Sequence, residues 1–332
     1  MILFILLSCQ EAIQATKTPV IESETAVFTS VSMDYAIGSL SAITTASLDV
    51  HQDISSVSGD PILRFEGGYL WQLNRFNYDT IRKYDSSDLS RPLTEVSVSP
   101  ENGSSNPHDV AICDDQLFIS LFEQSEILIL SPEDLSELGR IDILDFADSD
   151  QRTEASSLLV LQGKLYLGLQ GLDRNNGYSN IGSTLLEIDC SEYKVSRSWT
   201  FGANIQLVDW TEDTFLISSH TLEEHSAGLY SFKPETETFE TIITSAENIS
   251  STTSNGDQIA FLSTGSTEDS YTLNCFNGEE WYTTTGFLEY LPDLGINQSS
   301  EIWVTAHWGW IDPNNAFSGI YRFDSTCQEL EP

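Results

Sequence analysis

Apolar and β-branched residues recur along the chain in short runs that are separated by polar loops. Each unit has one apolar run, a polar loop, and a second apolar run that ends in a turn rich in Asp, Ser, Glu or Pro. Six such units begin at residues 69, 117, 165, 215, 259 and 302, a spacing of 43 to 50 residues. Short runs of this composition predict β-strands, and helical periodicity is nearly absent.

Two further strands fit around each pair of runs. An inner strand precedes the pair, as in 109–113 and 157–161, and an outer strand follows it, as in 138–143 and 195–200. Repeats of about 40–50 residues with four short strands each are typical of a β-propeller. We therefore predict an all-β chain that forms a single propeller of seven four-stranded blades. The seventh copy, near residue 26, lacks an inner strand, so we expect N- and C-terminal strands to pair and close the ring.

The first nine residues form a separate apolar segment that is too short to span a bilayer. Its end, Leu6-Leu7-Ser8-Cys9, resembles a bacterial lipobox, which implies that Cys9 is lipidated and anchors the protein. No Lys or Arg precedes the segment, so the alternatives are a start codon placed too far downstream and a chance Cys. We expect residues 10–24 to be a flexible tether and residues 25–332 to be the propeller.

The chain is strongly acidic, with 51 Asp and Glu against 14 Lys and Arg and a formal net charge of −37. Nucleic acid is excluded as a ligand, because phosphate binding depends on clusters of Lys and Arg. An anionic membrane surface would repel the folded body for the same reason. We interpret the charge as a means of keeping an exported body soluble.

Motifs of common enzymes are missing. The sequence has no nucleophile elbow, no phosphate-binding loop, no dinucleotide fingerprint and no C-x-x-C pair. His220 and His225 enclose Thr-Leu-Glu-Glu, but this spacing is one residue too long for a zinc-protease motif and lies in a loop. We therefore assign no catalytic residue and expect no required cofactor.

One loop is dense in carboxylates. Asp145, Asp148, Asp150 and Glu154 lie within ten residues, directly before a predicted inner strand. Ca²⁺ takes six to eight oxygen ligands, so these four residues are candidates for a Ca²⁺ site. The loop does not follow the EF-hand spacing, and in so acidic a chain the alternative is an ordinary solvated loop.

Further polar residues come from loops that the repeat alignment places on one face, around the central channel. Arg75 and Arg174 would hold an anionic or carbonyl-bearing group, and Trp308 and Trp310 would stack on a sugar. The alternative is that the Asp and Asn side chains tie loops together through backbone hydrogen bonds. The candidate ligand-binding set is Arg75, Asn77, His108, Asp109, Glu154, Asp173, Arg174, Asn175, His307 and Trp308.

Four cysteines follow Cys9, and an even number in a chain with an export signal favours disulfides. Three connectivities exist for four cysteines. We favour Cys113–Cys190 with Cys275–Cys327, because each pair belongs to neighbouring blades. Four buried free thiols are the alternative.

The stretches 106–112, 154–158 and 172–178 resemble secreted bacterial β-propellers related to the YVTN-repeat family, which include lipoproteins. The resemblance implies a ring-shaped platform on the cell envelope and transfers no catalytic residue. We expect a monomeric, non-enzymatic lipoprotein of the outer membrane that binds a protein, peptide or glycan. The alternative is an exported lactonase-like hydrolase or lyase, with a divalent cation in the channel held by Glu154, Asp109, Asn175 and Asp173.

Salt should stabilise this fold. Repulsion among the excess carboxylates destabilises the compact state, and dissolved ions screen that repulsion. We expect a higher Tm in molar NaCl than in dilute buffer, measured by near-UV circular dichroism. KCl at the same concentration is the control and should give the same shift, whereas a lower Tm in both salts would contradict the interpretation.

Overall fold

The computed structural model describes residues 25–330 except positions 33, 77, 102, 181, 203 and 212 and the segments 220–226, 246–247, 265–270, 288–289 and 308–318. Cys9 and the predicted tether therefore lie outside the described residues. The described chain forms twenty-eight β-strands and two 3-10 helices. None of its helices has the length and apolar character needed to cross a membrane.

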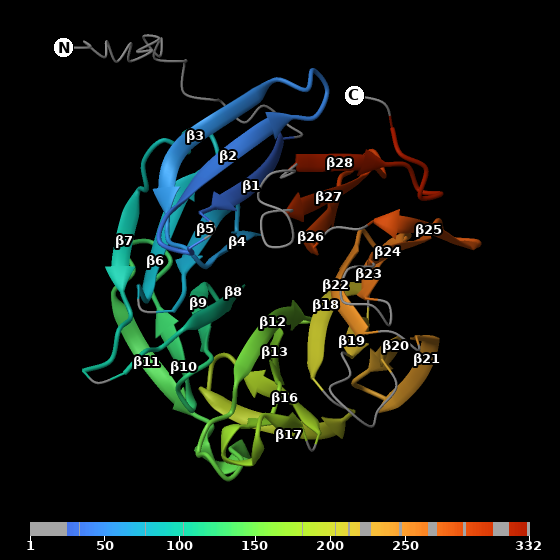
Figure 1. The fold of residues 1–332 in the computed structure, drawn as a ribbon. Helices are drawn as coiled ribbons and strands as arrows, with labels where there is room; N and C mark the ends of the chain where they lie inside the picture. Colours follow the sequence, from blue (N-terminus) through green and yellow to red (C-terminus); the bar gives the residue numbers. More distant parts are fainter. Residues whose placement is uncertain are drawn as a thin grey trace, which may run out of the picture.

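Seven antiparallel sheets of three or four strands follow one another around a ring, from the N-terminal sheet in blue to the C-terminal sheet in red (Figure 1). We number the sheets as blades 1 to 7. Blade 1 contains β1 (Thr25–Val31), β2 (Gly38–Thr44) and β3 (Val50–Val57). Blade 2 contains β4 (Pro61–Glu66), β5 (Tyr69–Asn74), β6 (Thr80–Asp85) and β7 (Thr94–Ser97). Blade 3 contains β8 (Pro107–Cys113), β9 (Gln116–Leu121), β10 (Glu126–Leu130) and β11 (Glu137–Asp142).

Blade 4 contains β12 (Ala155–Leu161), β13 (Lys164–Leu169), β16 (Ser183–Asp189) and β17 (Lys194–Phe201). Its loops hold η1 (Leu144–Phe146), β14 (Leu172–Asp173), η2 (Arg174–Asn176) and β15 (Ser179–Asn180). Blade 5 contains β18 (Ile205–Thr211), β19 (Thr214–Ser219), β20 (Ala227–Lys233) and β21 (Thr238–Ser245). Blade 6 contains β22 (Asn248–Ser254), β23 (Ile259–Thr264), β24 (Tyr271–Phe276) and β25 (Trp281–Phe287). Blade 7 contains β26 (Tyr290–Ile296), β27 (Ile302–His307) and β28 (Gly319–Phe323).

The predicted propeller of seven blades is confirmed, and the burial pattern explains why the sequence signal was clear. In the second strand of a blade both faces are covered by neighbouring blades, so β9 buries Leu117, Phe118 and Ile119 in succession. In the outer strand β17, exposed and half-buried residues alternate. The core therefore lies between the blades, as in the cluster that joins Phe118 of blade 3 to Leu167 of blade 4.

The expected closure by N- and C-terminal strands was wrong for the described strands. β1–β2–β3 and β26–β27–β28 are separate three-stranded sheets. The residues after β28 turn back along β28 itself: Asp324 N donates to Gln328 O at 2.9 Å, and Leu330 N donates to Arg322 O at 2.8 Å. An antiparallel bridge between Phe323 and Glu329 completes this contact. The tail thus covers the outer edge of its own blade.

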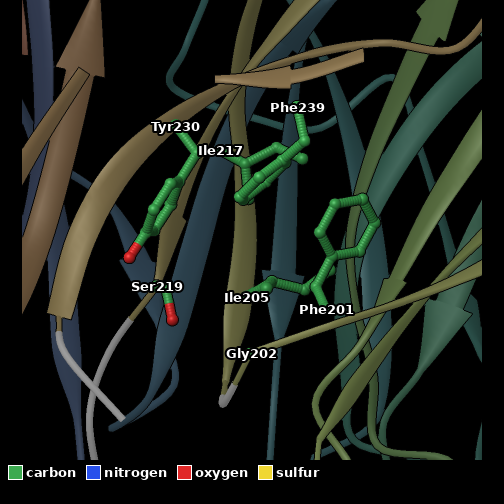
Figure 2. A pocket seen from close by; sticks show the side chains of 7 residues that line it. All are labelled: Phe201, Gly202, Ile205, Ile217, Ser219, Tyr230 and Phe239. Carbon is green, nitrogen blue, oxygen red and sulfur yellow. The ribbon is translucent and has the colours of Figure 1, made fainter. Parts of the chain in front are cut away.

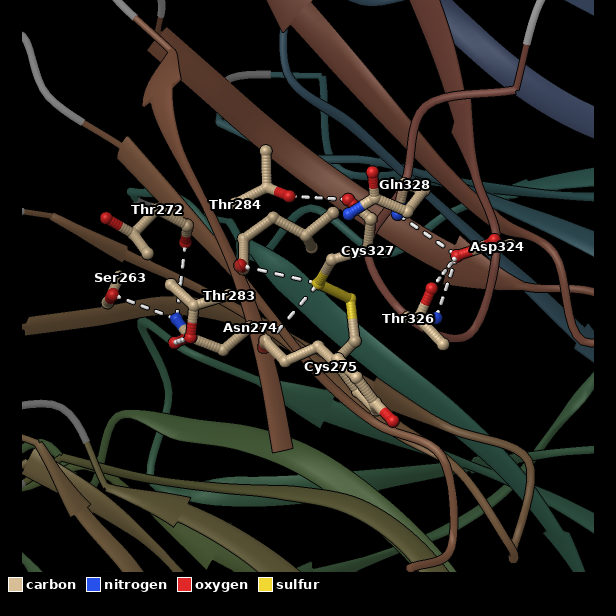
Figure 3. The surroundings of a disulfide bond; sticks show 12 residues. Ser263, Thr272, Asn274, Cys275, Thr283, Thr284, Asp324, Thr326, Cys327 and Gln328 are labelled. Carbon is tan, nitrogen blue, oxygen red and sulfur yellow. Dashed lines mark hydrogen bonds between the residues drawn. A yellow bond between two sulfur atoms is a disulfide. The ribbon is translucent and has the colours of Figure 1, made fainter. Parts of the chain in front are cut away.

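Both favoured disulfides are confirmed. Cys113 and Cys190 join blades 3 and 4, with their Cα atoms 6.1 Å apart. Cys275 in β24 and Cys327 in the C-terminal tail have Cα atoms 5.8 Å apart and join blades 6 and 7. Figure 3 shows Asp324 beside the second disulfide, where its Oδ1 accepts hydrogen bonds from the backbone N–H groups of Thr326 and Gln328. This turn and this disulfide fix the tail against blade 6.

Removing the second disulfide should loosen blade 7 selectively. We expect the double variant Cys275→Ser/Cys327→Ser to lose about 2–4 kcal/mol of unfolding free energy, because the crosslink restricts the unfolded chain. We also expect faster hydrogen exchange in β28, since among the described residues it is the tail that covers its outer edge. Cys113→Ser/Cys190→Ser is the control and should leave exchange in β28 unchanged. Unaltered protection of β28 in the first variant would contradict the proposed role of the tail.

Candidate functional site

Most of the candidate residues that the structure describes lie on what we call the loop face, whereas His108 and Asp109 belong to the inner strand β8. The loop face consists of the loops that join the second and third strands of a blade and the loops that lead into the next inner strand. The described loops used below are 32–37, 75–79, 98–106, 122–125, 143–154 and 170–182. The inner strand of each four-stranded blade begins at this face and ends at the opposite face, where a turn leads into the second strand.

A buried carboxylate connects three blades at the channel. Asp109 of β8 accepts a hydrogen bond from Arg64 Nε of β4 at 2.6 Å and a second from Arg64 Nη2. It also accepts from the backbone N–H groups of Val110 and of Leu158 in β12, both at 2.8 Å. Asp109 therefore links blades 2, 3 and 4, and both its oxygens are engaged by protein donors.

Asp293 of β26 adds a second carboxylate to the channel. It accepts from Ser251 Oγ of blade 6 and from Leu294 N, both at 2.9 Å. Its side chain is reached by solvent but enclosed by the inner strands, and this enclosure raises the pKa of Asp293 although the charge of Arg64 opposes the shift. The guanidinium of Arg64 thus supplies positive charge to both channel carboxylates, Asp109 and Asp293.

Arg75 has partners for Nη1 and Nη2 of its guanidinium group, whereas its Nε has no hydrogen-bond partner. It forms an ion pair with Asp60, and its Nη1 lies 3.1 Å from His108 Nε2. The imidazole stacks on Phe122, with ring centroids 4.3 Å apart. Burial, together with the charge of Arg75, lowers the pKa of His108 well below 6.5, so the ring is neutral and accepts the hydrogen bond. The two residues hold loops of blades 2 and 3 together.

Three carboxylates converge on blade 4. Ligand oxygens of Asp148, Asp150 and Asp173 all lie within 4.8 Å of one another. Ser149 Oγ donates to both oxygens of Asp173 at 2.9 Å. Two of the four predicted Ca²⁺ ligands are thus in this cluster together with Asp173, whereas Asp145 is exposed in η1 and lies outside it.

Glu154 is fully buried beside this cluster. Its Oε2 accepts from Leu172 N at 3.1 Å, while its Oε1 has no hydrogen-bond partner. Burial raises the pKa of Glu154 to about 7, and the charges of Asp150 and Asp148 add to the shift. The opposing influences are the Leu172 hydrogen bond and the charge of Arg174.

Arg174 is held by a residue that sequence reasoning missed. Its Nη1 and Nη2 donate to the two oxygens of Glu123 at 2.9 and 2.6 Å, and Arg152 pairs with the same carboxylate. Asn175 Nδ2 donates to Ser149 O at 3.1 Å. Neither Glu123 nor Arg64 belongs to a recognisable sequence motif. The sequence showed only that Arg64 is a charged residue in an inner strand and Glu123 a charged residue in a loop.

Exposed aromatics on the loop face were also missed as a group. Tyr35, Phe76 and Tyr178 are 52%, 62% and 59% exposed, and all three have a positive φ, of 54°, 40° and 62°. Left-handed backbone in a bulky residue is costly and marks a turn under strain. Tyr78 Oη donates to Ala36 O at 2.9 Å and so joins the loops of blades 1 and 2.

A small cavity lies where β17 of blade 4 leads into blade 5. Its volume is about 190 Å³, and Figure 2 shows the rings of Phe201, Tyr230 and Phe239 around it. Ile205, Ile217, Gly202 and Ser219 complete the lining. This volume is below the range of about 300–1,000 Å³ that is usual for small-molecule sites.

The remaining candidates fall outside the described residues. These are Asn77, Trp308 and Trp310, the side chain of His307, and the motif from His220 to His225.

No protein-family model matches the chain, and no curated protein is significantly similar to it in sequence. Solved propellers are similar in fold. The β-propeller domain of Cps50 (Swd1) from Myceliophteria thermophila has a TM-score of 0.61 at 11% identity, covering 87% of this chain and 96% of that one. The propeller of the trilobed protease from Pyrococcus furiosus, described as having an open velcro topology, has a TM-score of 0.57 at 11% identity, covering 93% and 94%.

A Bacteroides fragilis protein assigned as a 6-phosphogluconolactonase has a TM-score of 0.61 at 8% identity and covers 92% of each chain. Identities this low show the fold alone. The chain is therefore a propeller protein, and the comparisons match it to no YVTN-repeat family.

Asp109 should be the most sensitive of the channel residues. We expect Asp109→Ala to lower the unfolding free energy by about 3–5 kcal/mol, because it leaves Arg64 and the N–H of Leu158 without their acceptor. Arg64→Met is the matched variant and should cost less, since Asp109 keeps its backbone donors. Urea unfolding at neutral pH measures both, and an equal loss in the two variants would contradict the three-blade link.

Proposed function

We propose that the chain is an exported, non-enzymatic propeller whose loop face binds a protein or peptide segment. One observation carries the proposal: three exposed aromatic side chains on this face are held in left-handed backbone that a bulky residue adopts only at a cost. Aromatic side chains of this kind supply large contact areas in protein interfaces. The two disulfides support export, because such crosslinks persist in oxidising compartments.

The chemistry of the face indicates the kind of segment. The cavity beside Phe201 and Phe239 has the size of one apolar side chain rather than of a small-molecule substrate. A net charge of −37 attracts basic partners and repels acidic ones. We therefore propose a segment that combines basic residues with an apolar anchor. The resemblance of Leu6–Cys9 to a lipobox adds the proposal that a lipid on Cys9 anchors the protein to the outer membrane.

The alternative is a lactonase-like hydrolase, and fold similarity to the Bacteroides protein favours it. The site geometry gives this alternative less support. The charge of Asp109 is already paired with Arg64, and its oxygens also accept from two backbone N–H groups, so Asp109 is poorly placed to hold a channel cation. Arg75 and Arg174 are likewise paired with carboxylates and do not offer a free charge to a phosphate.

Phe76 and Phe65 allow a matched test, because both are phenylalanines of blade 2 that are 62% exposed. Phe76 lies on the loop face, whereas Phe65 lies at the turn between β4 and β5 on the opposite side. Peptides selected from a displayed random library against the intact chain should be rich in basic residues. Their affinity should fall about tenfold or more in Phe76→Ala and stay unchanged in Phe65→Ala.

Hydrolysis of gluconolactone and 6-phosphogluconolactone, assayed in parallel, separates the two functions. We expect no turnover above the uncatalysed rate. Turnover that depends on added divalent cation would favour the enzyme. The peptide proposal would be contradicted if no selected peptide lost affinity in Phe76→Ala. Selective binding on a glycan array would then identify the ligand as a sugar.

A further inference from the structure

The three carboxylates on blade 4 need more positive charge than their neighbours provide. Asp148, Asp150, Asp173, Glu154 and Glu123 bring five carboxylates to one region. Two guanidinium groups face them, those of Arg152 and Arg174, and both pair with Glu123. The nearest approach of either to the cluster is 4.0 Å, from Arg174 Nε to Asp150 Oδ2. Negative charge is left in excess in a place where Asp150 and Asp173 are nearly buried.

Two oxygens of this region have no hydrogen-bond partner. One is Asp148 Oδ2, and the other is Oε1 of Glu154, whose side chain is completely buried. Glu154 is anchored next to the cluster, because its Oε2 accepts from Leu172 N, the residue before Asp173. A buried acceptor without a donor destabilises the fold unless a ligand satisfies it. These orphan oxygens are therefore independent evidence for a missing cationic partner.

The loop geometry leaves room for such a partner. Asp148 Oδ1 accepts from Asp150 N at 3.0 Å, and Asp150 Oδ1 accepts from Arg152 N at 2.9 Å. These bonds fix the backbone while the second oxygen of Asp148 stays available. Ser149 Oγ shares both oxygens of Asp173, and each carboxylate oxygen retains a further lone pair.

We infer that Asp148, Asp150, Asp173 and Glu154 form a divalent cation site that takes Ca²⁺. All donors are oxygens, which suit Ca²⁺ and not the nitrogen or sulfur sites of zinc. The ligand oxygens of Asp148, Asp150 and Asp173 lie within 4.8 Å of one another, which matches Ca–O bonds of about 2.3–2.6 Å on opposite sides of one ion. Glu154 lies beside these three and would add its unpartnered Oε1. The ion joins loop 143–154 to loop 170–182. This inference is independent of the peptide-binding proposal, because neither Phe76 nor the cavity of blade 5 contributes a ligand.

Calorimetric titration of the intact, EDTA-treated chain with CaCl₂ tests the site. We expect one saturable site with a Kd on the order of 10⁻⁵–10⁻³ M, retained in about 0.5 M KCl because screening removes diffuse attraction but not direct coordination. MgCl₂ should bind more weakly, since Mg²⁺ gives up its water reluctantly. Tm should rise with Ca²⁺ concentration.

Asp148→Asn and Glu154→Gln should each weaken Ca²⁺ binding by about tenfold or more, because each removes one charged ligand. Asp145→Asn is the matched control: it removes the same charge from the same loop outside the cluster and should leave the affinity unchanged. Near-UV circular dichroism identifies any variant that misfolds. If one of the two ligand variants misfolds, the Ca²⁺ affinity of the other tests the site. No saturable site in the wild type, or an equal loss in Asp145→Asn, would overturn the inference.

Discussion

Apolar packing between blades is the interaction on which the whole structure depends. The second and third strands of a blade bury side chains on both faces, as β9 does with Leu117 and Phe118. Such a sheet needs a neighbour on each side, and a ring of sheets gives every blade two neighbours. The loop face exists because this packing fixes the positions where the strands begin and end.

The ends of the chain are where this packing needs help. Blades 1 and 7 have three strands each, so no shared sheet joins them in the described chain. The C-terminal tail covers the edge of β28, and Cys327 ties it to Cys275 of blade 6. A covalent bond between adjacent blades thus does part of what hydrogen bonding between terminal strands does in a closed ring. This solution requires oxidising surroundings, because the crosslink must stay oxidised.

What could be predicted from the sequence follows from this division. Strands and blades were predictable because buried strands such as β9 are continuous apolar runs with a fixed spacing. The disulfides were predictable because the repeat placed Cys113 beside Cys190 in neighbouring blades. The partners of Arg64 and Arg174 were not, since Asp109 and Glu123 lie 45 and 51 residues away in other blades. The strained conformation of Phe76 was hidden as well, because it depends on loop geometry that only the folded ring imposes.

Charge explains what the loop face is able to recognise. All nine Arg side chains of the described residues lie within 4.0 Å of a carboxylate. These Arg side chains pair with carboxylates that join strands and loops, so they attract an anionic ligand only weakly. The carboxylates outnumber these partners, and the excess includes buried oxygens such as Glu154 Oε1. Positive charge must therefore come from outside the chain. Dissolved salt supplies it to the exposed surface. In the two proposals made above, Ca²⁺ supplies it to the cluster of blade 4 and basic side chains of a bound segment supply it to the loop face.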